Sequence, residues 1–298
     1  MGEKMEKAPT PEEQIEAIVA LSLAEDLGHG DVTSEILIPP ELEGRASISA
    51  KEAGIVAGVE VAGRVFHRVD LSLNFTTLAK DGTAVRPGDK IAEVSGKVLS
   101  ILKAERTALN FLQRLSGIAS LTAKYTSEIK GLETYIADTR KTTPGLRRLE
   151  KHAVSLGGGT NHRLHLGDGI LVKDNHLAAL RAIGMSLKDI VARAKKNAPK
   201  GLKVEVEVTS IDEALEAAGA GADIIMLDNM SPDEMRQVVK LLKGKVKMEA
   251  SGGINLANVR QVALTGVDYI SIGALTHSPK ALDISLEFDP DSFKSASL

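Results

Sequence analysis

The sequence predicts an α/β protein in which a small β-rich unit precedes a parallel β/α barrel. Between residues 134 and 273, six short apolar runs alternate with segments of helical period, and this alternation is typical of parallel βα units. Residues 45–101 instead alternate apolar and polar positions broken by glycines, which indicates hairpins. No G-x-G-x-x-G follows the first apolar run, so a complete or incomplete barrel is favoured over an open dinucleotide-binding sheet.

The composition excludes several classes of protein. The chain has 298 residues, 43% of them hydrophobic and 26% charged, with a net charge of −3. This slightly acidic balance argues against a general nucleic-acid or anionic-membrane surface, so any basic site must be local. The absence of cysteine excludes disulfides, thiolate nucleophiles and Cys-ligated zinc. The polar N-terminus shows no secretory signal and its first apolar stretch is too short to span a bilayer, so we expect a cytoplasmic protein.

The N-terminal half begins with a capped helix. Thr10 is a candidate N-cap, Pro11 stands at the first helical position, Glu13 completes a capping box, and Gly28 follows the end. The run "DGTAVRPGDKIAEVSG" within the β-rich region resembles the hairpins of lipoyl and biotinyl carrier modules. A long helix is predicted over 103–130, because its leucines recur at helical spacing.

The predicted barrel elements follow in regular order. Strands are expected at 134–138, 169–174, 203–208, 223–228, 245–251 and 268–273, and helices at 185–198, 210–221, 231–244 and 255–266. In a βα barrel the chemistry lies at the carboxyl ends of the strands. Four of these strands end in polar residues, namely Asp138, Arg140 and Lys141; Lys173, Asp174 and Asn175; Asp228 and Asn229; and Glu249 with Ser251, Gly252 and Gly253.

The strand over 203–208 carries two carboxylates on one face. Its three valines share one side, which leaves Lys203, Glu205 and Glu207 on the other. Buried carboxylates need partners, and an internal ion pair with Lys173 or Lys247 is one interpretation. Because four strands end in polar residues together, we favour a chemical site at this edge.

Two glycine-containing turns suggest where an anion could bind. "SGG" at 251–253 precedes a predicted helix, and "IGA" at 272–274 follows the last strand. Glycines let the backbone approach an anion, and helix N-termini supply free N–H groups. Phosphate binding by the last two strands recurs in barrels, although ordinary tight turns would use the same glycines.

A basic segment, "DTRKTTPGLRRLEK" at 138–151, stands out in the acidic chain. Cations that follow strand ends, namely Arg140, Lys141, His162, Arg163 and Lys173, predict a polyanionic ligand, because arginine forks fit carboxylates and phosphates bidentately. We expect Arg147, Arg148 and Lys151 to lie on a solvated helix face instead.

Several motifs together resemble the quinolinate phosphoribosyltransferase (nicotinate-nucleotide pyrophosphorylase) family. They are "EDLGHGDVTSE", "AERTALNFLQRLSGIAS", "DTRKTTPGLRRLEKHAV", "GGGTNHR", "LVKDNH", "VEVEV", "IIMLDN", "EASGGI" and "SIGALTHS". They span residues 25 to 278 in the family's order. The resemblance implies an N-terminal α/β sandwich domain at 1–116, an incomplete (β/α) barrel at 117–275, and a tail at 276–298 that packs back on the sandwich.

The resemblance also implies a reaction and its partners. Quinolinate and phosphoribosyl pyrophosphate (PRPP) would give nicotinate mononucleotide, diphosphate and carbon dioxide, with Mg²⁺ required. No nucleic acid or membrane is expected as a partner, and a homodimer or higher homo-oligomer with shared active sites is implied.

Residue roles are carried over from the resemblance by position. Lys141, Lys173, Glu207 and Asp228 would be catalytic. Arg106, Arg140, His162, Arg163 and Lys173 would hold the quinolinate carboxylates, and Arg106 would come from a neighbouring subunit. Lys141 and Lys173 would face PRPP, and Glu207 and Asp228 would meet the ribose hydroxyls or, directly or indirectly, magnesium. The remaining substrate-binding positions are Thr139, Ser251, Gly252, Gly253, Ile272, Gly273 and Ala274.

Two alternatives stay open at the level of sequence. His165 and Gly167 stand where relatives often have glycine and a bulkier residue, so the preferred acceptor could differ. A relative encoded with molybdate transporters shares "RKTTPGLR"-type motifs, and it is the second candidate among enzymes. A carrier or binding module is the candidate from another class, but no modifiable lysine sits in a recognisable carrier tip.

Overall fold

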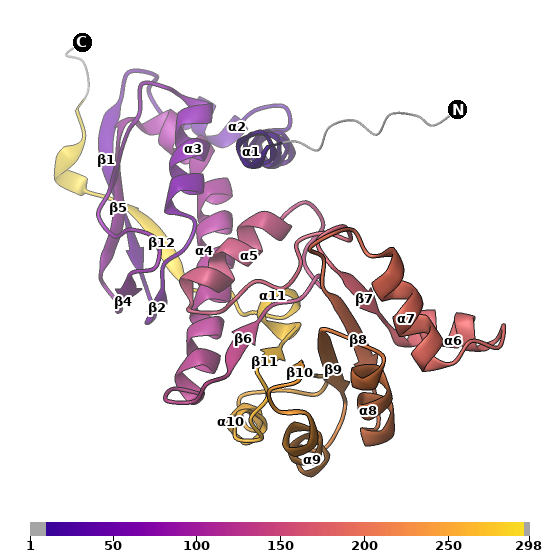
Figure 1. Ribbon diagram of the computed structural model, residues 1–298. Helices are drawn as coiled ribbons and strands as arrows, with labels where there is room; N and C mark the ends of the chain where they lie inside the picture. Colours follow the sequence, from indigo (N-terminus) through magenta and orange to yellow (C-terminus); the bar gives the residue numbers. More distant parts are fainter. Residues whose placement is uncertain (1–9, 295–298) are drawn as a thin grey trace, which may run out of the picture. The chain divides into compact units, whose positions relative to one another are not determined.

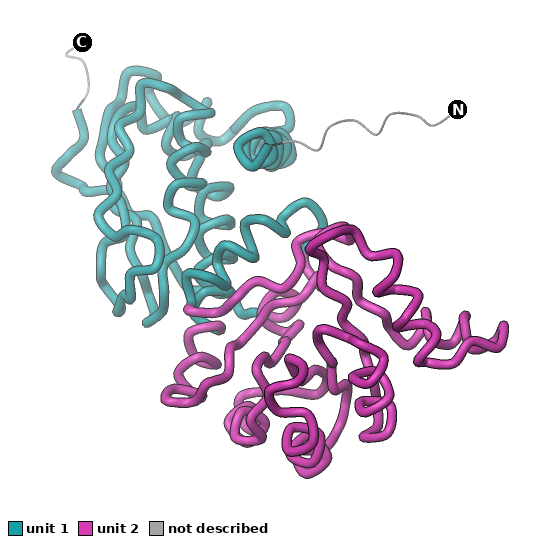
Figure 2. The backbone as a smooth tube through the Cα atoms, viewed as in Figure 1, with its two compact units in different colours: residues 1–121, 143–157, 279–298 teal, residues 122–142, 158–278 magenta. Residues whose placement is uncertain are grey.

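The computed structural model describes residues 10–294, which form two compact units. Unit 1 comprises residues 10–121, 143–157 and 279–294 of this range, and unit 2 comprises 122–142 and 158–278 (Figure 2). The secondary structure is mixed α/β (Figure 1), which confirms the predicted class. No helix within the described residues is both long enough and apolar enough to cross a membrane.

Unit 1 is built on an antiparallel sheet with the strand order β12-β1-β5-β3. The strands are β1 (Glu43–Ala50), β3 (Asn74–Thr77), β5 (Lys90–Lys97) and β12 (Ile284–Phe288), with a separate pair β2 (Gly54–Ile55) and β4 (Ala84–Val85). The helices of this unit are α1 (Pro11–Leu27), α2 (Val32–Leu37), α3 (Val59–Val69), most of α4 (Val98–Glu128), α5 (Arg147–Leu156) and a short 3₁₀ turn η1 (Pro290–Ser292).

Helix α1 has the predicted capping box. The Glu13 backbone N–H donates to the Thr10 hydroxyl at 3.2 Å, and the Thr10 N–H donates to the Glu13 carboxylate at 2.7 Å. Helix α3, with the sequence "VEVAGRVFHRV", lies within residues 45–101, which were expected to form a β-rich unit. Its apolar residues fall on one helical stripe, and Phe66 stacks on Phe75 of β3 with ring centroids 5.6 Å apart. Packing therefore overrides β propensity here.

The last described strand completes the sheet of unit 1. Strand β12 pairs with β1 in the register Ile48↔Leu286. The preceding segment lies against α4, where the Leu282 N–H donates to the Gln113 carbonyl at 3.0 Å. A Cβ on Gly117 would overlap the Lys280 carbonyl oxygen, so only glycine allows the two backbones to approach this closely.

Helix α5 corrects one expectation. Arg147 and Arg148 are half-buried, and Lys151 is only 3% exposed, so the solvated face expected for these three residues is wrong, most clearly for Lys151. The neighbouring Glu150 is fully buried and pairs with Arg114 at 2.8 Å. A lysine this deeply buried needs partners for its ammonium group as well as apolar contacts for its stem, and charge content alone does not reveal either.

Unit 2 contains six parallel strands in the order β6-β11-β10-β9-β8-β7. The strands are β6 (Tyr135–Ala137), β7 (Ile170–Val172), β8 (Val204–Val208), β9 (Ile224–Asp228), β10 (Lys247–Ser251) and β11 (Tyr269–Ser271). The two strands that come first in the chain, β6 and β7, lie at the two ends of this order and do not pair within the described residues. The barrel is therefore incomplete.

The helices of the barrel alternate with its strands, as expected from the sequence. They are α6 (Asp174–Arg181), α7 (Leu187–Asn197), α8 (Ile211–Gly219), α9 (Pro232–Leu242), α10 (Val259–Ala263) and α11 (Ala274–His277). All six predicted strands are confirmed. Helix α10 is shorter than the predicted 255–266, because Asn255 and Asn258 form turn hydrogen bonds with the backbone around Gly253. Helix α6 was not predicted.

We expect Gly117→Ala to destabilise the protein, because the new methyl group must displace the 279–282 backbone from α4. Overpacking of this kind costs about 1–3 kcal/mol, measured as a lower urea midpoint. The matched control is Gly219→Ala in α8, where a Cβ meets nothing within 4 Å; it should leave the midpoint unchanged or raise it slightly. Equal effects of the two substitutions would contradict the packing described for Gly117.

Candidate active site

A cavity of about 690 Å³ lies at the carboxyl ends of the barrel strands, entirely within unit 2. Nearly all the site residues named from the sequence line it. They are Thr139, Arg140, Lys141, His162, Arg163, Lys173, Glu207, Asp228, Ser251, Gly252, Gly253, Ile272, Gly273 and Ala274. The exception is Arg106, which is exposed on α4 in unit 1.

Two arginines form the least solvated part of the cationic wall. Arg163 is half-buried and donates to the Gly169 carbonyl at 3.1 Å, while the Nε of Arg140 is buried and has no partner within residues 10–294. Burial, with the Arg140 charge nearby, lowers the pKa of Arg163 below its ordinary value. Two guanidinium groups held together in a partly dry wall favour an anion that neutralises both.

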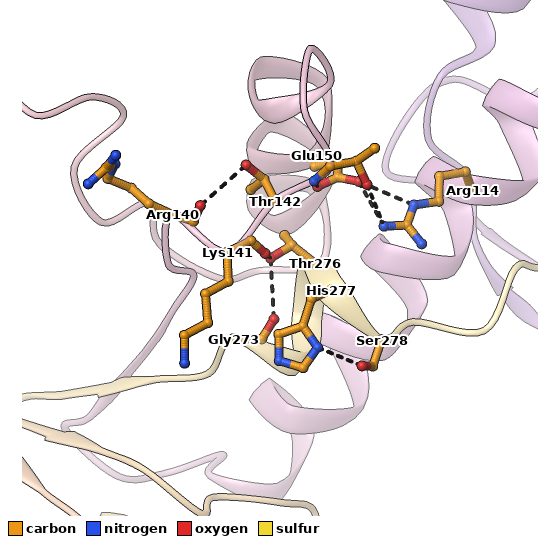
Figure 3. Close-up of polar contacts among 10 residues, drawn as sticks. Arg114, Arg140, Lys141, Thr142, Glu150, Gly273, Thr276, His277 and Ser278 are labelled. Carbon is orange, nitrogen blue, oxygen red and sulfur yellow. Dashed lines mark hydrogen bonds and ion pairs between the residues drawn. The ribbon is translucent and has the colours of Figure 1, made fainter.

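Two lysines extend the cationic wall. The Lys141 backbone is fixed because its N–H donates to the Thr139 hydroxyl at 3.1 Å. Its carbonyl accepts from Thr276 Oγ1 at 2.8 Å (Figure 3). Its stem passes over Gly273, where a Cβ would stand 3.0 Å from Lys141 Cδ. Neither the Lys141 nor the Lys173 ammonium group has a hydrogen-bond or ion-pair partner among the described residues, so both can bind a ligand.

Carboxylates form another wall of the cavity. Glu207 of β8 and Asp228 of β9 both line it, as does Asp174 at the start of α6. Burial raises the pKa of Glu207, and the charges of Asp228 and Asp174 raise it further. Such a group of like charges favours a cation or a ligand that carries positive charge.

A second acidic group, of which Glu249 and the neighbouring His162 line the cavity, lies on β8 and β10. His162 Nε2 lies 3.1 Å from Glu205 Oε2 and 3.6 Å from Glu249 Oε2, and His162 Nδ1 accepts from the Arg163 backbone N–H at 2.8 Å. These three side chains could hold a metal ion, because their ligand atoms lie within 4.8 Å of one another. Both ring nitrogens of His162 are therefore occupied by contacts within the protein. The valines of β8 lie on the opposite face of the strand from Glu205 and Glu207, as expected.

The protonation of Glu249 follows from its surroundings. It is 2% exposed, and its Oε1 and that of Glu205 are buried without a partner in the described part of the chain. Burial and the neighbouring Glu205 charge raise the pKa of Glu249 from its ordinary 4.5 to about 7. A proton on Glu249 relieves the repulsion between the two buried carboxyl groups.

The turns at the strand ends have the backbone that an anion site needs. Gly252 and Gly253 have φ of +86° and +64°, which favours glycine. Both turns named from the sequence, 251–253 and 272–274, contribute to the cavity lining.

Sequence reasoning left several lining residues off the list of site residues. They are Leu171, Asp174, Met226, Asn229, Glu249, Ile254, Ser271 and His277. Asp174, Asn229 and Glu249 already stood among the polar strand ends, which was the available signal. The inward orientation of Met226 and Ser271 depends on strand register instead.

His165 does not line this cavity. It is 62% exposed, and its Nε2 pairs with Asp168 Oδ1 at 2.9 Å, while its Nδ1 accepts from the Gly167 backbone N–H at 3.2 Å. His165 and Gly167 therefore belong to a local turn rather than to the cavity wall.

An incomplete βα barrel whose strand ends present cations, carboxylates and glycine turns has the arrangement of a barrel enzyme with a site for anionic ligands. The family model "Quinolinate phosphoribosyl transferase, C-terminal domain" matches residues 118–287, and the corresponding N-terminal domain model matches 31–116. The chain belongs to the quinolinate phosphoribosyltransferase family.

Known relatives are similar over nearly the whole chain. The chain is 43% identical to a probable nicotinate-nucleotide pyrophosphorylase [carboxylating] of Bacillus subtilis, over 92% of this chain and 93% of the relative. It is 43% identical to the chloroplastic enzyme of that name from Arabidopsis thaliana, over 98% and 87%. The solved structure of NadC from Streptococcus pyogenes is 42% identical, with a TM-score of 0.88 over 98% of this chain and 100% of that one.

We expect Glu249→Gln to change how stability depends on pH. A carboxyl group whose pKa rises on folding stabilises the native state fully below its unfolded pKa, and this contribution is lost as the pH rises through about 7. A shift of this size corresponds to about 3 kcal/mol. As the pH rises from 5 to 8, the free energy of unfolding of the variant should therefore increase relative to that of the wild type.

Urea titrations at the two pH values measure this difference. Glu12→Gln, at an exposed position, is the control for loss of a carboxylate. Its difference from wild type in free energy of unfolding should change far less between pH 5 and pH 8. A Glu249→Gln difference that is the same at pH 5 and pH 8 would show that Glu249 is ionised throughout this range.

Proposed function

We propose that this protein converts quinolinate and PRPP to nicotinate mononucleotide, diphosphate and carbon dioxide, a step of NAD biosynthesis. The observation that carries the proposal is the division of one cavity into a cationic wall, a carboxylate wall and two glycine turns. The two substrates supply the complementary groups, since quinolinate has two carboxylates and PRPP has a phosphate, a ribose and a diphosphate.

The quinolinate end is assigned to the arginines. Arg140 and Arg163 lie in the least solvated part of the cationic wall, and the free Nε of Arg140 can donate to a carboxylate. The Lys173 ammonium, at the end of β7, is available to the second carboxylate. His162 contributes through its position under Arg163, whose backbone N–H it binds, so that it supports the arginine as well as lining the cavity.

The PRPP end is assigned to Lys141, the two turns and the carboxylates. The backbone N–H groups at 251–253 and 272–274 and the Lys141 ammonium suit the phosphate groups. Glu207 and Asp228 suit the ribose, whose ring carries positive charge as the diphosphate departs. Fixed carboxylates stabilise that developing charge without reorganising.

The reaction needs no covalent enzyme intermediate. The pyridine nitrogen forms the bond to the anomeric carbon while the bond to the diphosphate oxygen breaks. The bond from ring C2 to its carboxylate then breaks, carbon dioxide leaves, and the electron pair left on C2 takes up a proton. The protein's part is to orient the ring by its carboxylates and to stabilise charge at both ends.

Mg²⁺ fits the residues present. Oxygen ligands are the preferred ones, and Mg²⁺ usually takes one or two protein carboxylates together with waters and substrate phosphates. Glu207 and Asp228, directly or through water, would hold the ion, which would neutralise charge on the departing diphosphate.

We further propose a homodimer or larger homo-oligomer in which Arg106 serves the cavity of a neighbouring subunit. Arg106 is exposed on α4 and has no ion-pair partner within residues 10–294, so its charge is available to a ligand. A two-fold arrangement would build two equivalent shared sites. The cytoplasmic location expected from the sequence stays a prediction.

The direct test is an assay with quinolinate, PRPP and Mg²⁺ that measures nicotinate mononucleotide and carbon dioxide. We expect Lys141→Ala and Lys173→Ala to lower kcat/KM by about 10- to 150-fold each, because each removes a charge-assisted contact. Lys196→Ala on the exposed part of α7 is the control and should retain wild-type activity. Similar losses in all three variants would show that the site is elsewhere.

Quinolinate should be strongly preferred over nicotinate as the acceptor. Nicotinate lacks one carboxylate, so part of the cationic wall would stay unpaired in a partly buried place, and such mismatches discriminate strongly. Comparing kcat/KM for the two acceptors measures the preference. Comparable values, or a clear preference for another carboxylated acceptor, would instead favour the reaction of the relative encoded with molybdate transporters.

Subunit mixing tests the role of Arg106. The weakly active Arg106→Ala and Lys173→Ala proteins are dissociated and allowed to reassociate together, and the activity of the mixture is compared with that of each variant alone. If Arg106 acts in trans, a mixed dimer has one site with both defects and one with neither, so about a quarter of wild-type sites return. If every site keeps a defect and no activity returns, with subunit exchange verified by native mass spectrometry, Arg106 acts within its own subunit or not at all.

A further inference from the structure

Asn229 has an unusual backbone conformation next to the carboxylate wall. It follows β9 directly and is the one non-glycine residue among residues 10–294 with positive φ, at 52°. Asparagine tolerates this left-handed region better than most residues, but glycine adopts it at no cost. The conformation alone therefore does not explain why an amide stands here.

The Asn229 side chain binds the carboxylate assigned to the ribose or the metal ion. Its Nδ2 donates to Asp228 Oδ2 at 2.7 Å, and its backbone N–H donates to the Ser251 carbonyl at 2.9 Å. A hydrogen bond to an ionised acceptor is about twice as strong as a neutral one. One residue thus contacts both the end of β9 and the end of β10.

The other end of the amide fills the space inside the glycine turn. A Cβ on Gly252 would overlap Oδ1 and Cγ of Asn229 and would stand 2.9 Å from its backbone nitrogen. The absence of a side chain at position 252 therefore lets the Ser251–Gly253 turn close against the Asn229 amide. The amide lies between Asp228 and this turn, and all of them line the cavity.

We propose that Asn229 is a positioning residue that fixes the Asp228 carboxylate and the Ser251–Gly253 turn at one separation, so that the ribose and the phosphate groups of PRPP bind together. The inference rests on the proposed function for the identity of the ligand. Asn229 acts through its two neighbours: the donated hydrogen bond orients Asp228, and the bulk of the amide shapes the turn. Quinolinate binding at the arginine wall does not depend on it.

Two substitutions separate the backbone from the amide. Asn229→Gly keeps the left-handed backbone and removes the amide, and Asn229→Asp keeps the shape but replaces the donor with a charge that repels Asp228. We expect Asn229→Gly to unfold within a few degrees of wild type yet to raise the KM for PRPP about tenfold or more and to lower kcat. The KM for quinolinate should change little. Asn229→Asp should lose more activity with PRPP than Asn229→Gly does.

Calorimetry with inorganic diphosphate and Mg²⁺ gives a readout that does not depend on turnover. Asn229→Gly should bind diphosphate about tenfold more weakly than wild type, whereas Asn197→Asp, the control at the end of α7, should bind it as wild type does. Wild-type PRPP kinetics and wild-type diphosphate binding in Asn229→Gly would overturn the inference, because only the backbone would then matter. Equal rises of the KM values for PRPP and for quinolinate in Asn229→Gly, together with a lowered melting temperature, would also overturn it.

The same experiment keeps the two proposals apart. A wild-type protein that does not turn over quinolinate would refute the proposed function. The calorimetric comparison of wild type with Asn229→Gly would then still decide whether Asn229 fixes an anion-binding turn.

Discussion

The site depends on one geometric constraint, which is that six parallel strands end at the same edge of their sheet. Because all their carboxyl ends meet there, residues more than a hundred positions apart in the chain line one cavity. The same convergence brings like charges together, so that Arg140 meets Arg163 and Glu207 meets Asp228. Such repulsion is tolerated because the strands hold the backbone rigid, and it leaves the groups ready for ligands of opposite charge.

Buried polar contacts behind the cavity hold its cationic wall in place. The fully buried Asp138 accepts from Asn161 Nδ2 at 2.6 Å and from the His162 backbone N–H at 2.9 Å. His162 in turn binds the Arg163 backbone and Glu205. A carboxyl group buried at the end of β6 therefore positions the loop that carries Arg163, and each of these partners would leave an unsatisfied group if it were removed.

The sequence predicted the barrel well because its signal is periodic. The valines of β8 alternate with Glu205 and Glu207 as a strand requires, and both carboxylates lie on the opposite side from the valines. For the same reason, nearly all the site residues named from the sequence line the cavity, although the apolar lining residues were missed. By contrast, α3 contains valines that suit a strand, yet its apolar residues form one buried helical face that includes Phe66 against Phe75. Lys151 looked solvated because its charge says nothing about where its stem lies, and the role of Asn229 depends on a dihedral angle that no local pattern encodes.

The discontinuous make-up of unit 1 has a consequence for synthesis on the ribosome. Its sheet takes three strands from residues 43–97 and its edge strand from 284–288, so the edge of β1 stays uncovered until residues 284–288 have been made. An exposed strand edge is a template for pairing with other chains, and pairing across such a sequence separation forms slowly. Most of unit 2 is translated while this edge is still open. The nascent protein is therefore most vulnerable to aggregation between the synthesis of β1 and that of β12, when chaperones that shield strand edges would matter most.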